Sequence, residues 1–404
     1  MTSRSFAGQL LFRSRAVRDG RWKRCGSWRH LVLGCLLLLP VAGFAQGTVA
    51  AWGLGLDGQT TVPPDVDDAV AIGAGHLHSL VVRADGTVAA FGANAFGQRD
   101  VPLGLTGVTA VAGGLGHSLA LKSDGTVVAW GDNGSGQATV PAGLTGVTAI
   151  AAGLLHSLAL KSDGTVVAWG SDGSGQATVP PGLTGVTAIA AGRFHSLALK
   201  SDGTVVGWGS NLDGEIDIPP GLSGVVALAA GNVLSMALRS DGTVVVWGDF
   251  DNPRPVPDGL ANVVAIAAGV FHCLALRADG TVVAWGFDSD GQASIPAGLS
   301  GVSAIAAGSF HSLALRRALT PASAIRALRD DVAALRGVVV RNALQVKLNV
   351  ALAALAASKP QVACQSLQSF RALAAAQRNK HLTAAQANYL MAQAADIRLL
   401  MDCR

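Results

Sequence analysis

The chain has few of the side chains on which most catalytic sites depend. Its 404 residues include one glutamate, Glu215, and one tyrosine, Tyr389, so a pair of glutamates for acid and base catalysis is excluded. The G-x-S-x-G, H-E-x-x-H and P-loop motifs are also missing. Asp288-Ser-Asp290-Gly291 resembles the start of a Ca²⁺ loop, but no glutamate follows at the twelfth position. We therefore expect no enzyme activity, no cofactor and no metal site.

Charged residues are scarce as well, at 14% of the chain, whereas hydrophobic residues make up 50% and glycine occurs 51 times. This composition excludes a disordered acidic or basic chain. It favours a β-rich repeat protein with many tight turns. No run of about 18 or more apolar residues occurs, so we expect no membrane span in the mature protein.

The few charges are unevenly distributed. Residues 47–318 contain 11 basic and 21 acidic residues, a net charge of −10, whereas residues 1–46 and 319–404 each carry +7. The acidic central region argues against nucleic-acid binding, because phosphate contacts need clustered positive charge. The basic C-terminal region could face an anionic surface or the chain's own acidic region, and the sequence leaves both open.

The N-terminus has the pattern of an export signal. A basic segment precedes an apolar run at residues 31–39, and Gly43-Phe44-Ala45 follows. This order is typical of a secretory signal peptide cut after Ala45, so we expect residues 1–45 to be removed and a bacterial protein to be secreted or periplasmic. Cys364 and Cys403 are then plausible disulfide partners, because such bonds persist in oxidising compartments.

The central region repeats a unit of 39 residues seven times. An aromatic residue, a proline and a histidine recur in the copies, and each series steps by 39 residues except for one step of 38. Such a period is the signature of a repeat architecture. The aromatic series is Trp52, Phe91, Trp130, Trp169, Trp208, Trp247 and Trp285, and the histidine series is His78, His117, His156, His195, Leu234, His272 and His311.

Each copy is predicted to form one antiparallel sheet. In residues 156–169 two strand-forming runs flank Asp163-Gly164, the pair favoured in two-residue hairpin turns. Residues 147–152 indicate a third strand. The repeats start in mid-copy at Gly47 and stop in mid-copy at Leu315, so joining the ends completes the seventh hairpin and removes exposed sheet edges. We therefore predict an all-β, closed, seven-bladed β-propeller over residues 46–317.

The phrases AGxxHSLALxxDGTVVAWG and Gly131-Asp-Asn-Gly-Ser-Gly-Gln137 resemble regulator-of-chromosome-condensation repeats. The 39-residue unit is shorter than is usual in that family and is closer to that of the secreted propeller inhibitors of class A β-lactamases. The resemblance covers residues 47–317 and implies a propeller. It implies little about function, because propellers host many activities.

Residues 318–404 are predicted to form a small all-α bundle. Ile325, Leu328, Val332 and Leu335 recur at helical spacing, and Thr383-Ala-Ala-Gln386 is a capping box that opens another helix. The segment resembles the FIMAH-type helical module found at the ends of secreted bacterial proteins. That resemblance implies a compact, disulfide-tied bundle.

The repeated aromatic and histidine residues are predicted to be structural. Equivalent positions on different blades lie too far apart to share one ion, so packing and hydrogen bonding explain them better than metal binding does. This set is Trp52, Trp130, Trp169, Trp208, Trp247, Trp285, His78, His117, His156, His195, His272 and His311.

Positions where the copies differ are the candidates for binding. The 38-residue step falls in a segment that contains Phe250 and Arg254, Leu234 replaces histidine nearby, and the two residues before each histidine vary. Aromatic residues and arginine often anchor interfaces. The candidates are Arg193, Phe194, Asn232, Val233, Phe250, Arg254, Phe271 and Phe310. Decay of an unused copy explains the deviations equally well.

These patterns together predict a monomeric, exported propeller that binds a protein partner through the loops of one face. Binding of carbohydrate or cell wall is the alternative, although tryptophan and tyrosine are scarce in the loops. Inhibition of β-lactamases, or a hydrolase or lyase activity, is less favoured. In the inhibitors aromatic residues commonly precede the repeat histidine, whereas here only Phe194, Phe271 and Phe310 do.

Overall fold

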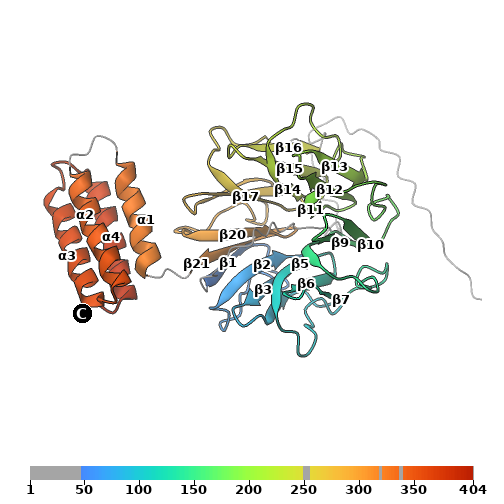
Figure 1. The fold of residues 1–404 in the computed structure, drawn as a ribbon, viewed down its shortest axis with the longest axis horizontal. Coiled ribbons are helices and arrows are strands. Elements are labelled where there is room, and N and C mark those ends of the chain that lie inside the picture. Colours follow the sequence, from blue (N-terminus) through green and yellow to red (C-terminus); the bar gives the residue numbers. More distant parts are fainter. Residues whose placement is uncertain (1–46, 249–254, 318–320, 336–339, 404) are drawn as a thin grey trace, which may run out of the picture. The chain divides into compact units, whose positions relative to one another are not determined.

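The computed structural model describes residues 47–248, 255–317, 321–335 and 340–403. The predicted signal peptide and the candidates Phe250 and Arg254 lie outside these ranges. Residues 47–317 are built of β-strands and residues 321–400 of helices (Figure 1). The strands are β1 (Gly47–Gly53), β2 (Ala69–Ala74), β3 (His78–Arg83), β4 (Val88–Gly92), β5 (Val108–Gly113), β6 (His117–Lys122), β7 (Val127–Gly131), β8 (Val147–Ala152), β9 (His156–Lys161), β10 (Val166–Gly170), β11 (Val186–Ala191), β12 (His195–Lys200), β13 (Val205–Gly209), β14 (Val225–Ala230), β15 (Leu234–Arg239), β16 (Val244–Gly248), β17 (Val263–Ala268), β18 (His272–Arg277), β19 (Val282–Gly286), β20 (Val302–Ala307) and β21 (His311–Arg317).

The strands form repeated three-stranded, blade-like antiparallel sheets. Five of these sheets are separate, from β5-β6-β7 to β17-β18-β19, and the sixth sheet has six strands in the order β20-β21-β1-β2-β3-β4. Within it β1 pairs with β21 along seven residues, from Gly47 opposite Arg317 to Gly53 opposite His311. The first strand of the region thus supplies the third strand of the last copy. In Figure 1 the labels β20, β21, β1 and β2 accordingly lie side by side.

The first strand of each copy contacts the first strand of the next. These contacts run from β2 to β5 and onward to β20, and β20 also contacts β2. Such close approach needs small side chains, and the ends of these strands are accordingly rich in alanine, as in Val147–Ala152. The buried side chains of neighbouring sheets interleave; Trp208, for example, packs in one cluster with residues of three copies.

The C-terminal helices are α1 (Pro321–Ala334), α2 (Arg341–Ala356), α3 (Pro360–Ala376) and α4 (Ala384–Leu400). Their apolar stripes, including Ile325, Leu348 and Phe370, meet in one buried cluster. The Thr383 Oγ1 accepts a hydrogen bond from the Gln386 N–H at 3.1 Å, and the Gln386 side chain accepts one from the Thr383 N–H at 2.9 Å, which is a capping box. Cys364 and Cys403, the expected pair, are joined by a disulfide.

Candidate functional site

A hydrogen bond between neighbouring copies explains the histidine that recurs in six of the seven copies. The ring Nε2 of the histidine is within hydrogen-bond distance of the Oγ of a serine in the next copy, 40 residues further on. Both side chains are buried. The Nε2–Oγ distances are 3.0 Å for His78 and Ser118, 3.1 Å for His117 and Ser157, 3.0 Å for His156 and Ser196, 3.0 Å for His195 and Ser235, and 2.9 Å for His272 and Ser312. His311 makes the same bond to Ser79 at 3.0 Å, from the last copy to the first.

The same serines explain the repeated tryptophan and glutamine. The Ser118 hydroxyl donates to the Gln98 carbonyl oxygen at 2.8 Å, and the Trp130 Nε1–H donates to that same oxygen at 2.9 Å. Since the serine proton goes to the carbonyl, its oxygen is left to accept the Nε2–H of His78. Five of the junctions between copies are therefore held by one histidine, one serine, one tryptophan and one main-chain carbonyl, and Phe91 stands in place of the tryptophan where His311 meets Ser79.

Burial keeps these histidines neutral. Removal from water lowers the pKa of His78, His117, His156, His195 and His311 to about 3. Each ring also lies close against a glycine: a Cβ on Gly75 would stand 2.2 Å from the His78 Cε1. A histidine that is buried, hydrogen-bonded and uncharged at neutral pH is suited to holding the blades together and not to proton transfer.

One junction departs from this scheme. Leu234 stands at a histidine position and Cys273 at the matching serine position, and both are buried in one apolar cluster with Met236.

Glu215, the single glutamate, stands at a glutamine position, where its main-chain carbonyl oxygen accepts hydrogen bonds from the Ser235 hydroxyl at 2.6 Å and the Trp247 Nε1–H at 3.1 Å. Glu215 is only 2% exposed. Its role is therefore that of the glutamines in the other copies.

The turns before the histidines and the loops after the third strands lie at the same end of the blades. The main-chain N–H of Ala93 bonds to the Leu77 carbonyl at 2.8 Å, and that of Phe287 bonds to the Phe271 carbonyl at 2.7 Å. We call this end the histidine-turn face. It comprises the turns 75–77, 114–116, 153–155, 192–194, 231–233, 269–271 and 308–310 and the loops 54–59, 93–98, 132–137, 171–176, 210–215 and 287–292.

The turns of the histidine-turn face converge on an apolar cluster. Leu154 and Val270, which are 3% and 1% exposed, pack together although they belong to copies that are not neighbours. Leu115, Leu155, Phe194 and Phe271 surround them and are partly buried. The cluster therefore joins turns from opposite sides of the repeat region.

Most of the candidate binding residues lie around this cluster. The Arg193 guanidinium stacks on the Phe194 ring at 4.6 Å and donates to the Asn232 Oδ1 at 3.3 Å. Phe310 lies edge-on to His76, and Phe271 lies edge-on to Phe287 with 6.1 Å between the ring centres. Asn232 is buried, whereas Phe194, Val233, Phe271 and Phe310 are partly exposed.

Sequence comparison of the copies missed the most exposed apolar side chains of this face. Leu56, Phe96, Leu212 and Phe287 are 71%, 55%, 89% and 44% exposed, and each lies in a loop after a third strand. Most other copies have serine, glycine, alanine or aspartate at these positions, so a large apolar residue in this loop was the signal that could have found them. The same loops contain six aspartates, Asp57, Asp132, Asp172, Asp213, Asp288 and Asp290.

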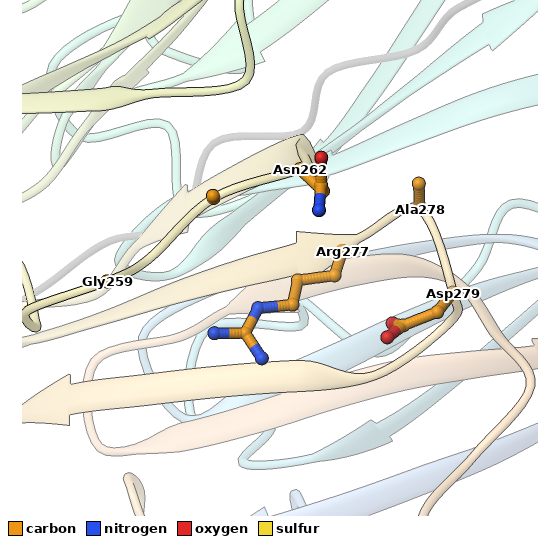
Figure 2. A pocket seen from close by; sticks show the side chains of 6 residues that line it. Gly259, Asn262, Arg277, Ala278 and Asp279 are labelled. Carbon is orange, nitrogen blue, oxygen red and sulfur yellow. The ribbon is translucent and has the colours of Figure 1, made fainter. Parts of the chain in front are cut away.

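The opposite end of the blades contains the Asp-Gly hairpins and is called the hairpin face. Asp124, Asp163 and Asp202 each pair with a lysine two residues earlier, at 3.0, 3.0 and 3.1 Å. The hairpin face also has a pocket of about 380 Å³, lined by Gly259, Ala261, Asn262, Arg277, Ala278 and Asp279 (Figure 2).

Within the described ranges no three histidine, cysteine, aspartate or glutamate side chains are grouped so as to hold a metal ion. Asp288 instead closes a turn: its carboxylate accepts the Ala293 N–H at 2.7 Å and the Ser294 hydroxyl at 2.6 Å. Of the helices described, none has the length and apolar character needed to cross a membrane.

The regulator of chromosome condensation (RCC1) repeat matches five segments, residues 69–98, 108–137, 147–176, 186–215 and 263–292. Five copies of the β-sheet region thus match the RCC1 repeat. The two copies outside the match are the one with Leu234 and the one completed by β1. No curated protein sequence matches the chain.

Solved structures of other proteins have a similar fold. Human WBSCR16 is 19% identical, with a TM-score of 0.56, over 67% of this chain and 100% of its own. Prp20p from Saccharomyces cerevisiae is 18% identical, with a TM-score of 0.59, over 72% of this chain and 97% of its own. Yeast RCC1 (Prp20) bound to Kap60 gives 18% identity and a TM-score of 0.58, over 76% of this chain and 97% of its own. At these identities the likeness establishes a β-propeller fold and no more.

Proposed function

We propose that this chain is an exported binding protein whose RCC1-type propeller holds a protein partner on the histidine-turn face. The observation that supports it best is the set of apolar side chains on that face. Leu56, Phe96, Leu212 and Phe287 are exposed in its loops, and Phe194, Phe271 and Phe310 lie half-buried among its turns. Exposed aromatic residues around a packed apolar centre are the usual anchors of a protein interface.

The charge of the histidine-turn face indicates which kind of protein partner would fit it. The six loop aspartates make the histidine-turn face acidic, while Arg193 is half-buried near the apolar cluster. A partner with apolar side chains surrounded by lysine and arginine would complement this surface. The fold neighbours also bind proteins, as Prp20p does Gsp1p and histones and yeast RCC1 does Kap60.

The blades, in this proposal, form a closed ring of seven. Three observations support closure: β1 pairs with β21, β20 contacts β2, and His311 bonds to Ser79 of the first complete copy. Packing of Leu154 against Val270 fits a ring whose turns meet near its axis.

Export is the remaining part of the proposal. The N-terminal pattern of basic, apolar and small residues supports it, and so does the Cys364–Cys403 disulfide, since disulfides persist in oxidising compartments. Fractionation of the native host, with an antibody against the propeller, tests it. A mature protein outside the cytoplasm that begins at Gln46 is expected, and a full-length cytoplasmic protein would overturn it.

A capture experiment with matched surface variants tests binding. The mature chain serves as bait for exported proteins of the host, beside a Phe271→Ala/Phe287→Ala variant and a hairpin-face control, Lys161→Ala/Asp163→Ala. The proposal expects one partner to be retained by the wild type and the control and lost by the phenylalanine variant. Retention by the phenylalanine variant together with loss by the control would assign binding to the other face.

A further inference from the structure

The hairpin face contains a basic residue at one fixed place in every copy, five residues after the histidine position. In three copies it is a lysine whose ammonium group pairs with the hairpin aspartate, as Lys122 does with Asp124 at 3.0 Å. In the first copy it is Arg83, which bonds instead to the carboxylate of Asp65 in the loop before β2. These copies show two kinds of ion pair on the hairpin face. The hairpin aspartate pairs with a lysine ammonium group, or the arginine pairs with a carboxylate from the loop before the first strand.

Among the described residues, neither pairing is made by Arg277 or by Arg239 of the preceding copy, and the pocket lies beside Arg277. Gly259 takes the place of Asp65, because the Leu260 N–H bonds to the Pro257 carbonyl just as the Val66 N–H bonds to that of Pro63. Among the described residues, Arg277 and Asp279 form no ion pair within 4.0 Å with any side chain. The Arg277 Nε is buried and lacks a hydrogen-bond partner there as well. Because a buried donor without a partner is destabilising, a ligand that supplies an acceptor is favoured.

The pocket coincides with a coupled change in the sequence. Four copies have a glycine before the first strand and a serine after the basic residue, and a Cβ on Gly146 would lie 3.4 Å from the Ser162 Oγ. Here the glycine is Asn262, with a φ of 57°, and the serine is Ala278. The smaller Ala278 leaves room for the amide, and Figure 2 shows Asn262 across from Arg277 and Asp279.

We propose that this pocket binds a small zwitterion, a free α-amino acid, with its carboxylate on Arg277 and its ammonium group on Asp279. Each half repeats a pairing seen elsewhere in the chain, Arg83 with Asp65 and Lys122 with Asp124. One oxygen of Asp279, Oδ1, already accepts the Thr281 N–H at 2.9 Å and hydroxyl at 2.6 Å, so Oδ2 receives the ammonium group. Charge-assisted bonds of this kind are the strong ones in proteins. The site lies on the hairpin face and is independent of the proposed protein partner.

The test follows the arginine side-chain Nε–H resonances of the full chain by NMR while L-alanine is added. We expect the Arg277 signal to shift and saturate. Acetate and methylammonium, which each offer half of the ligand, are expected to bind at least about tenfold more weakly, since tenfold corresponds to the loss of one such bond. Acetate binding as tightly as alanine would overturn the zwitterion assignment, and an unmoved Arg277 signal would overturn the site.

Matched variants locate the site. Gly259→Asp places a carboxylate where the first copy has one and is expected to block alanine binding. Gly259→Asn imposes the same backbone strain without the charge, and its affinity for alanine is expected to stay within about twofold of that of the wild type. Arg277→Met should abolish binding, whereas Arg239→Met, at the same place in the preceding copy, should not. Equal losses in both arginine variants would contradict the proposal.

Discussion

Leu234 and Cys273 occupy the two positions at which other neighbouring copies place a hydrogen-bonded histidine and serine, and they lie buried in the same apolar cluster. Loss of one member alone would leave a buried polar group without its partner, which costs about 1–3 kcal/mol. Both positions have changed, so the junction remains packed. The apolar pair thus takes the place of the polar pair in this blade.

The first prediction is a double-mutant cycle at this junction. Leu234→His and Cys273→Ser should each destabilise the chain by about 1–3 kcal/mol, because each inserts one half of a polar pair. The double variant should recover part of that loss, with a coupling of about 0.5–3 kcal/mol. Urea unfolding gives the free energy of unfolding of the wild type, the two single variants and the double variant. Strictly additive effects would show that the two side chains do not meet.

Acid should weaken the propeller in a defined pH range. The buried histidines have a pKa lowered to about 3 from an ordinary value of 6.5. Between these values the unfolded chain binds protons that the folded chain does not, so stability is complete above about pH 6.5 and falls as the pH drops toward 3. Each histidine contributes at most about 1.4 kcal/mol per pH unit.

The variant His156→Leu/Ser196→Cys, which copies the Leu234 junction, provides the control for that pH dependence. It removes one of the titrating groups and should reduce the slope of unfolding free energy against pH in this range. An unchanged slope would mean that the acid sensitivity arises from other groups.

Closure of the ring can be tested by crosslinking. Ala50 of β1 lies opposite Ala314 of β21, within the distance that a disulfide spans between paired strands. Ala50→Cys/Ala314→Cys should oxidise to a species with one large closed loop, which has an altered gel mobility. Ala50→Cys/Ala275→Cys, with the second cysteine at the same place in the preceding copy, should not. Crosslinking of both pairs alike would contradict the β1–β21 pairing.

The Cys364–Cys403 disulfide should stabilise the helical region alone. It closes a loop with a sequence separation of 39, for which chain entropy gives about 4 kcal/mol. In a Cys364→Ser/Cys403→Ser variant, amide exchange should accelerate in α3 and α4 and stay unchanged in the β-strands. Faster exchange throughout the strands would show that the disulfide supports the propeller too.

Much of the architecture could be predicted from the sequence because it depends on local signals. Asp163-Gly164 indicated a hairpin, and the period of 39 residues indicated repeated sheets. The partners within each junction could not be predicted, since His78 bonds to Ser118 and Trp130 to Gln98 only after neighbouring blades pack. For the same reason the roles of the repeated glutamines and serines could not be predicted. The pocket at Arg277 required the structure, because Gly259 and Ala278 meet there only in the folded chain.

The most direct test of the account is amide hydrogen exchange of the mature chain, with and without a captured partner. The proposal predicts protection in the turns 114–116, 153–155, 192–194 and 269–271 and in the loops that contain Phe96 and Phe287. Exchange at the Asp-Gly hairpins, such as Asp163-Gly164, should stay the same. Protection of the hairpins or of α1 to α4, with these turns unchanged, would contradict binding through the histidine-turn face.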